Sequence, residues 1–310
     1  MTTRRKVLTG LGVAALGGSA AAAYRVAPSF WHQMARDLSR PVNPPRFAPD
    51  PAKWPDTGIH AAWLGHSTVL LKIEGTTVIT DPVFSHRAGI DLWIATLGIK
   101  RLVQPAILLH RLPKIDLILL SHAHMDHFDL PSLRALESKG TQVITASGTA
   151  DLLRLDRYAK VEQLSWGEAS QVGAVRVRAF PVNHWGARLR SDTWRGYNGY
   201  VLESGRRRVL FGGDTAMSDT FRGVRDSRPI DLGIMPIGAY NPWIRAHCNP
   251  EQAMKMINDA HVEAIIPVHH KTFTLSREPV HEPLERLLHA AGPAADRVLI
   301  HEIGQEAHLG

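Results

Sequence analysis

The stretch LILLSHAHMDHFDL, residues 117–130, places an apolar run directly before a dense group of potential metal ligands. Four of them follow the run within six positions: His122, His124, Asp126 and His127. A short apolar run bounded by polar residues is typical of a buried β-strand. Side chains at the end of such a strand are held on a rigid support. The stretch therefore predicts either a polar surface turn or one part of a metal site.

The composition is that of an ordinary globular protein, with 44% hydrophobic and 21% charged residues in 310. That length is common for a single α/β domain. The formal net charge is +7, but no nucleic-acid-binding motif accompanies it, so we expect no nucleic-acid partner. Cys248 is the only cysteine, which excludes an intrachain disulfide and a zinc site made of thiolates alone.

The N-terminus reads as an export signal. Residues 3–25, TRRKVLTGLGVAALGGSAAAAYR, run from a basic pair through a Gly/Ala-rich apolar stretch to small residues. This layout resembles a twin-arginine signal, with a cleavage site near 21–23. We therefore predict a signal segment over 1–27, recognition by the twin-arginine export machinery and a periplasmic location. A helix of the core and a retained membrane anchor stay open as alternatives, as does cleavage.

A proline-rich stretch, RPVNPPRFAPDPAKWP at 40–55, follows the signal segment. Proline at this density prevents regular helix and central-strand hydrogen bonding. We predict that residues 28–58 form a linker that wraps onto the body, with one short helix near its start. The catalytic body is then expected to occupy residues 59–310.

Short strand-like runs alternate with helix-like runs along the body. Three successive strand-like runs at 59–82 indicate antiparallel pairing at the start. Further strands are predicted at 114–121, 141–147, 174–184, 199–204, 206–215, 231–239 and 263–270, and helices at 130–140, 148–156, 249–260 and 283–292. No internal repeat is present. The pattern predicts an α/β fold of the αββα type, in which two mixed sheets lie between helical layers.

Three further candidate ligands also follow apolar runs directly. With the first four they make a set of seven: His122, His124, Asp126, His127, His184, Asp214 and His269. A zinc ion at a catalytic site needs about three protein ligands. Seven suits two metals that share a bridging carboxylate and a bridging hydroxide. Imidazole and carboxylate favour zinc, manganese or iron and disfavour copper(I) or an iron–sulfur cluster. A single H-x-H is weak evidence, whereas H-x-H-x-D-H after a buried strand is specific.

The motif SHAHMDH, followed at long intervals by single His, Asp and His residues, resembles the metallo-β-lactamase superfamily. Eight motifs in order are similar to the N-acylphosphatidylethanolamine-hydrolysing phospholipase D group, with ascorbate-6-phosphate lactonases as further relatives. These motifs are GHSTVLL, TDPVFSHRAG, SHAHMDH, NHWGAR, GGDT, PIGAYNPW, HCNPEQA and VHHKTF. The resemblance covers about residues 59–290 and implies the αββα sandwich.

The resemblance also implies roles for particular residues. One metal would be held by His122, His124 and His184, the other by Asp126, His127 and His269, with Asp214 bridging; two zinc ions are expected, with manganese or iron as alternatives. Asp126 and His247 would be catalytic, and Asp81 and His66 would support the ligands from behind. From their positions, Lys271 is predicted to bind a phosphate or else to point outward, and Tyr240 to line an acyl-binding groove or else to belong to the core. The chain departs from the group at His270–Lys271, where Trp–Gly is usual, and at Ala216, where glycine is frequent.

The function implied is a phosphodiesterase of phospholipase D type that acts on N-acylphosphatidylethanolamine-like or related phosphodiesters. A lactonase acting on a sugar-acid lactone is an alternative, because the same activated water can attack an ester carbonyl. An alternative of another class is a non-catalytic periplasmic metal- or lipid-binding protein. β-Lactam hydrolysis and RNA cleavage are disfavoured. A phosphodiester or lipid-like substrate is the expected partner, and peripheral membrane contact and a homodimer stay open.

Overall fold

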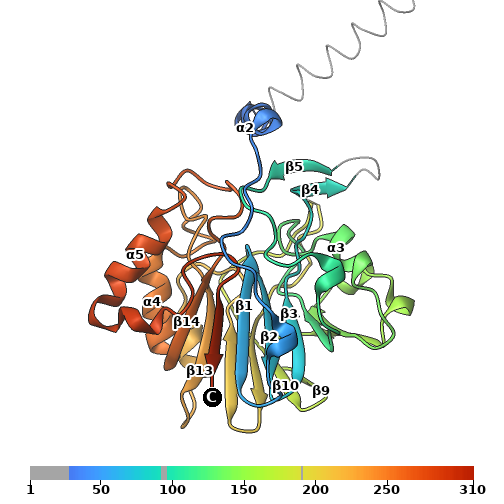
Figure 1. Ribbon diagram of the computed structural model, residues 1–310, viewed down its shortest axis with the longest axis vertical. Helices are drawn as coiled ribbons and strands as arrows, with labels where there is room; N and C mark the ends of the chain where they lie inside the picture. Colours follow the sequence, from blue (N-terminus) through green and yellow to red (C-terminus); the bar gives the residue numbers. More distant parts are fainter. Residues whose placement is uncertain (1–27, 92–95, 190) are drawn as a thin grey trace, which may run out of the picture.

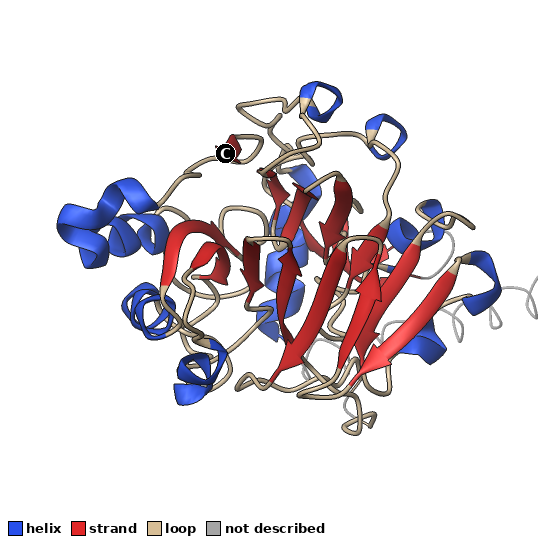
Figure 2. Ribbon diagram, turned by 90° about the horizontal axis from the view of Figure 1, so that it is seen from below, coloured by secondary structure: helices blue, strands red, loops and turns tan. Residues whose placement is uncertain are grey.

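The computed structural model describes residues 28–91, 96–189 and 191–310. Within these residues two large mixed sheets lie face to face with helices on the outside (Figures 1 and 2). The first sheet is antiparallel from β15 to β3 and parallel from β3 to β8. Its strands, in spatial order, are β15 (Glu306–Leu309), β1 (Ile59–Gly65), β2 (Thr68–Ile73), β3 (Thr76–Thr80), β6 (Leu117–Leu119), β7 (Gln142–Ala146) and β8 (Lys160–Leu164).

The second sheet mixes the two pairing modes in the same way. It is parallel from β14 to β12 and antiparallel from β12 to β9. Its strands, in spatial order, are β14 (Val262–Val268), β13 (Ile230–Pro236), β12 (Arg207–Phe211), β11 (Gly199–Ser204), β10 (Val175–Phe180) and β9 (Ala169–Val172). A separate hairpin pairs β4 (Arg87–Asp91) with β5 (Thr96–Lys100).

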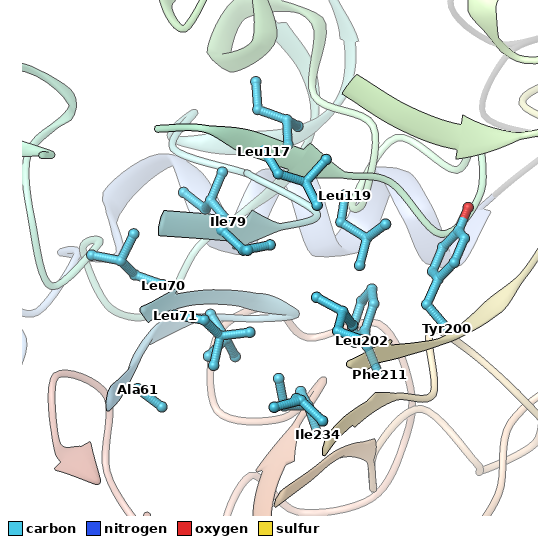
Figure 3. Packing of buried hydrophobic residues seen from close by; sticks show 14 of the residues in the cluster. Ala61, Leu70, Leu71, Ile79, Leu117, Leu119, Tyr200, Leu202, Phe211 and Ile234 are labelled. Atoms are coloured by element: carbon cyan, nitrogen blue, oxygen red, sulfur yellow. The ribbon is translucent and has the colours of Figure 1, made fainter. Parts of the chain in front are cut away.

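The main core lies between the two sheets. Figure 3 shows side chains of the first sheet opposite side chains of the second, and each of those labelled is fully buried. Burying one large apolar side chain stabilises the fold by about 1.5–3 kcal/mol. The labelled residues of the first sheet are Ala61, Leu70, Leu71, Ile79, Leu117 and Leu119, and those of the second are Tyr200, Leu202, Phe211 and Ile234.

Helices cover the outer faces of the sheets. α4 (Pro250–Asp259) and α5 (Glu282–Ala291) pack against the outer face of the second sheet, where Ile257 and Leu287 belong to one apolar cluster with Leu210. α3 (Leu130–Ala135) lies on the opposite side of the molecule (Figure 1). The remaining helical pieces are α2 (Pro28–Ser39), η1 (Pro51–Lys53), η2 (Leu109–Arg111), η3 (Ala150–Leu152), η4 (Leu155–Arg157), η5 (Asp219–Val224) and η6 (Gly292–Arg297).

The two-sheet prediction is confirmed, and the differences are local. The start of α4 is as predicted, because Asn249 caps the helix and Gln252 closes a capping box. The predicted helix over 148–156 is wrong: the segment holds only the short 3₁₀ turns η3 and η4. The side chain of Gln163 accepts hydrogen bonds from the amides of Thr149 and Ala150 and fixes this non-α path. Strands β4, β5, β8, β9 and β15 were not predicted.

The segment before the body lies along its surface in the described part, residues 28–58. The backbone of Asn43 pairs with residues 102–104, and Trp54 donates its indole N–H to Glu306 at 2.6 Å. The predicted signal segment over 1–27 lies outside the described residues. None of the helices within 28–91, 96–189 and 191–310 combines the length and apolar character that crossing a membrane requires.

Candidate dinuclear metal centre

The predicted ligands gather where strands of both sheets end. The H-x-H-x-D-H loop follows β6, and the loops after β10, β12 and β14 bring in the other three. The chain thus delivers His122, His124, Asp126, His127, His184, Asp214 and His269 to one place. Loops on a rigid scaffold commonly carry functional side chains in this way.

The first ligand group consists of His122, His124, His184 and Asp214, whose ligand atoms all lie within 4.8 Å of one another. His124 Nδ1 is 2.8 Å from His122 Nε2 and 3.2 Å from His184 Nε2. Asp214 Oδ2 is 3.9 Å from His122 Nε2 and 3.8 Å from His184 Nε2. Three imidazole nitrogens therefore converge on one point beside a carboxylate.

The second group consists of His66, Asp126, His127 and His269, whose ligand atoms all lie within 4.8 Å of one another. The same Asp214 oxygen lies beside this group. Asp214 Oδ2 lies 3.0 Å from His127 Nε2 and 3.1 Å from His269 Nε2. Asp126 Oδ2 lies 3.6 Å from His127 Nε2 and 3.4 Å from His269 Nε2. Asp214 thus stands between the two groups, in the position that a bridging ligand would occupy.

The donor set fits a pair of metal ions. Zinc binds imidazole nitrogen at about 2.0–2.1 Å, so neighbouring ligands of a tetrahedral site lie roughly 3.3 Å apart. The spacings within both groups are close to this value. His127 Nε2, His269 Nε2 and Asp214 Oδ1 are buried and make no hydrogen bond within the described structure. Buried polar atoms are nearly always satisfied, and a cation between these groups would satisfy them.

A hydrogen-bond chain supports one histidine of each group from behind. Asp81 Oδ2 accepts from His127 Nδ1 at 2.7 Å and from Ser121 Oγ at 2.5 Å. Because the Ser121 hydroxyl donates to Asp81, it accepts from His122 Nδ1 at 2.9 Å. His184 Nδ1 donates to the carbonyl of Ala246 at 2.8 Å. Each contact directs the opposite ring nitrogen toward the centre, as outer hydrogen bonds do in metal sites.

Burial and charge set the protonation of the ligands. Burial lowers the pKa of His184 to about 3 and that of His122 well below its usual value. Burial opposes the charge on Asp214, but His127 and His269 hold the pKa of that carboxyl well below its usual range. At neutral pH His122 and His184 are therefore neutral and Asp214 is ionised, as metal binding requires. Burial also opposes the charge on His127 and His269, but Asp214 and Asp126 outweigh burial and raise the pKa of both rings above the usual value, so these two rings must lose a proton before they can bind a metal.

The backbone is strained at several positions around the centre. His66, Asp81 and His269 have positive φ angles of 53°, 32° and 63°, which non-glycine residues seldom adopt. Gly213, at φ +57°, precedes Asp214, and a Cβ there would lie 2.8 Å from both Ser121 Cβ and the Asn198 carbonyl oxygen. Such strain clusters at functional sites, where the surrounding structure holds it in place.

Comparison with known proteins identifies the family. A sequence model described as a beta-lactamase superfamily domain matches residues 76–270. The chain belongs to the metallo-β-lactamase superfamily. An uncharacterized protein of Mycobacterium tuberculosis is 34% identical over 285 residues, which cover 89% of this chain and 76% of that protein.

A second relative carries an activity in its name. The N-acyl-phosphatidylethanolamine-hydrolyzing phospholipase D 1 of Caenorhabditis elegans is 30% identical over 250 residues, which cover 75% of this chain and 69% of that protein. Among solved structures, the isothiocyanate hydrolase from Delia radicum gut bacteria superposes with a TM-score of 0.63 at 16% identity, covering 80% of this chain and 98% of that one. At that identity the match supports the superfamily fold alone. Together with the candidate metal groups, the relatives identify this chain as a metal-dependent hydrolase of the superfamily.

Three other residues with predicted roles, His66, Asp81 and His247, also lie at the candidate metal centre. His66 Nε2 donates to Asp126 Oδ2 at 3.0 Å, and Asp81 holds His127 as described above. His247 places Nδ1 3.7 Å from Asp214 Oδ2, and its ring stacks on that of His269. Burial lowers the pKa of His247 to about 4, although Asp214 opposes this shift, so its imidazole is neutral at neutral pH.

The two residues predicted to contact substrate, Lys271 and Tyr240, form hydrogen bonds with other groups of the protein. Lys271 Nζ donates to Glu302 Oε1 at 2.8 Å and to the carbonyl of His301 at 2.9 Å. Tyr240 donates its hydroxyl to Glu282 Oε1 at 2.7 Å. These contacts give both residues a structural role, and a contact with substrate stays a prediction for each. Of the exposed tryptophans, Trp185 lies edge-on to His124, with ring centroids 4.8 Å apart.

Sequence reasoning missed Ser121 and Arg188. Arg188 Nη1 donates to the carbonyls of Ala123 at 3.0 Å and Phe128 at 2.8 Å. These carbonyls bracket the loop that carries His124, Asp126 and His127, so one guanidinium ties that loop to the loop after His184. The only signal in the sequence was the position of Arg188 at the end of the NHWGAR motif. Carbonyl contacts of this kind leave no pattern in residue type.

Proposed function

We propose that the protein is a dinuclear metal-dependent phosphodiesterase that hydrolyses phosphodiesters of the N-acylphosphatidylethanolamine type. The observation that carries this proposal is the sharing of Asp214 Oδ2 by two ligand groups, each with imidazole nitrogens converging on it. A two-metal centre of this kind suits displacement at phosphorus, where charge develops on both the attacking and the leaving oxygen.

The similarity to the Caenorhabditis elegans enzyme supports the reaction class, because the chain spans 69% of a relative whose name states phospholipase D activity. A second relative with that activity in its name, the mitochondrial protein of Saccharomyces cerevisiae, is 32% identical over 263 residues, which cover 80% of this chain and 55% of that protein. We extend the activity named for these relatives to the present chain as part of the proposal.

Two zinc ions are the cofactor we propose, and they would supply electrophilic assistance and lower the pKa of a bound water. The remaining work falls to the residues of the chain. The Asp126 side chain is 18% exposed, whereas that of Asp214 is 1% exposed. Asp126 is therefore the carboxylate placed to accept a hydrogen bond from the attacking water and to orient it, while His66 holds the carboxylate in position.

His247 lies beside Asp214, with its ring stacked on that of His269. Its side chain is 13% exposed, and its neutral ring offers one N–H group to a phosphate oxygen or to the leaving oxygen.

We also propose that the chain is exported by the twin-arginine route and acts in the periplasm on a phosphodiester or lipid-like substrate.

A substrate panel tests the proposal. Purified protein loaded with zinc, manganese or iron is assayed on bis(p-nitrophenyl) phosphate, on N-acylphosphatidylethanolamine in mixed micelles and on a set of sugar-acid lactones, with metal content measured in the same samples. We expect phosphodiester hydrolysis and about two metal ions per chain. Turnover of lactones alone would establish the lactonase alternative, and metal binding without turnover of any substrate would establish a binding protein.

A further inference from the structure

A cavity of about 330 Å³ lies beside the metal centre. Strands β4 and β5 form one wall, and Met125, Asp126 and Leu275 complete the lining. The hairpin contributes Ala88, Gly89, Ile90, Leu97 and Gly98. The volume of the cavity falls at the lower end of the range for small-molecule sites, which is about 300–1,000 Å³.

Asp126 belongs to both the cavity and the metal centre. Its carboxylate lies within 3.6 Å of the ring nitrogens of His127 and His269, and the same residue lines the cavity. A substrate whose phosphorus lies at the centre can therefore extend one substituent into the cavity.

The chemistry of the lining selects the kind of substituent. Apart from Asp126, every lining residue has an apolar side chain or is glycine. A phosphate or carboxylate group would find no cationic side chain among the lining residues, and a sugar would lose hydrogen bonds to water without replacement. A hydrocarbon group gains free energy in proportion to the apolar area it buries there.

The wall formed by β4 and β5 is held in place by α2. This helix lies outside residues 76–270, which the superfamily model matches. Fully buried Asp37 accepts from the amide of Lys100 at 2.9 Å. Arg40 donates to the carbonyls of Lys100 at 2.7 Å and Arg101 at 3.0 Å. On the body side, Ala88 packs in one apolar cluster with Phe273 and Leu275. The wall is thus fixed both by α2 and by the loop that follows β14.

We propose that this cavity is the subsite for the apolar substituent of the phosphodiester, and that α2 holds its wall in place. The inference rests on the proposed function and names the substrate class more closely: a diester with a hydrocarbon group near the scissile phosphate. Asp37 of α2 and Arg40, which directly follows the helix, bond to the wall and are therefore positioning residues for substrate selection.

Two synthetic diesters with one leaving group test the subsite. Methyl p-nitrophenyl phosphate and dodecyl p-nitrophenyl phosphate, the latter below its critical micelle concentration, are compared by kcat/KM. We expect the wild-type protein to favour the dodecyl ester at least about tenfold, since even single methylenes change kcat/KM by such factors in apolar pockets.

Leu97→Trp, which places a larger side chain at the cavity, is expected to remove that preference while changing kcat/KM for the methyl ester by less than about twofold. Leu155→Trp is the matched control, because Leu155 is an exposed leucine that does not line the cavity. Leu97→Ala removes apolar surface from the cavity wall and should also reduce the preference for the dodecyl ester. This variant replaces Leu97→Trp in the test if the tryptophan variant fails to fold. Asp37→Asn should reduce the preference with unchanged metal content.

The outcomes separate the two proposals. Equal kcat/KM of the wild-type protein for both diesters, or an equal loss on both in Leu97→Trp, would overturn the subsite while the phosphodiesterase function stands. Hydrolysis of lactones with no hydrolysis of either diester would overturn the function itself, and the subsite with it.

Discussion

His127 Nδ1 donates a hydrogen bond to Asp81 Oδ2 over 2.7 Å, and both side chains are fully buried. Asp81 also accepts from Ser121, which in turn accepts from His122. One carboxylate therefore orients a histidine of each ligand group. Partners of this kind fix the ring and raise the basicity of the ligand, so the integrity of the metal centre should depend on Asp81, which lies outside the two ligand groups described above.

Asp81→Asn should weaken metal binding by about 10- to 100-fold, because the carboxamide carries no charge and cannot accept both hydrogen bonds equally well. Competition with a chromogenic chelator measures the affinity. Asp116→Asn is the control, since Asp116 also accepts a backbone amide, from Thr77 at 3.0 Å, but takes no part in the cluster. Equal affinities of the two variants would show that Asp81 does not tune the ligands.

Asp214→Asn should remove the shared ligand of both groups. Asp214 Oδ2 lies within 3.1 Å of His127 and His269 and within 3.9 Å of His122 and His184, so neither group stays complete. We expect metal content to fall below two per chain and turnover to fall by on the order of 10²- to 10³-fold. Atomic absorption and steady-state assays give the two values, and circular dichroism checks the fold. Full activity in this variant would rule out a centre bridged by Asp214.

The gathering of the seven candidate ligands could be predicted from the sequence because its signal is local. Each candidate lies just past the end of an apolar run, as His122 does after β6 and Asp214 after β12, and buried strands are visible as such runs. The two-sheet architecture follows from the same runs.

The support of the centre could not be predicted in this way. Ser121 and Arg188 act through a hydroxyl and through backbone carbonyls, and such contacts depend on three-dimensional approach rather than on residue pattern. Strands β4 and β5 were missed because each contains a glycine, Gly89 or Gly98, and is only partly buried, which weakens the alternation that predicts a strand. Their contact with α2 joins residues more than 55 positions apart, such as Asp37 and Lys100.

Arg188→Met should loosen the ligand loop. The substitution leaves the buried carbonyls of Ala123 and Phe128 without their charged donor, and each hydrogen bond to a charged group contributes about 1.5–3 kcal/mol. We expect a loss of about 3–6 kcal/mol in the free energy of unfolding from the two bonds together, with weaker metal binding. Denaturant unfolding and chelator competition measure the two effects.

Arg188→Lys should restore part of the stability and part of the metal affinity that Arg188→Met loses. An ammonium group can reach one carbonyl but does not reproduce the planar guanidinium. Arg154→Met is the matched control: Arg154 pairs with Glu137 at 2.6 Å on the surface, and exposed pairs contribute only about 0–1 kcal/mol. A loss of stability with unchanged metal affinity in Arg188→Met would limit the residue to a structural role.

Metal loading should release protons at neutral pH. Burial alone would lower the pKa of His269, but Asp214 and Asp126 raise it to about 9 in the metal-free protein. At pH 7 this imidazole is therefore protonated, and it must lose its proton to become a ligand. Calorimetric zinc titrations in two buffers of different ionisation enthalpy should show at least one proton released per chain. The number of protons released should fall as the pH rises through about 9, where metal-free His269 is already neutral. Identical heats in both buffers at pH 7 would contradict a protonated His269 at the metal-free centre.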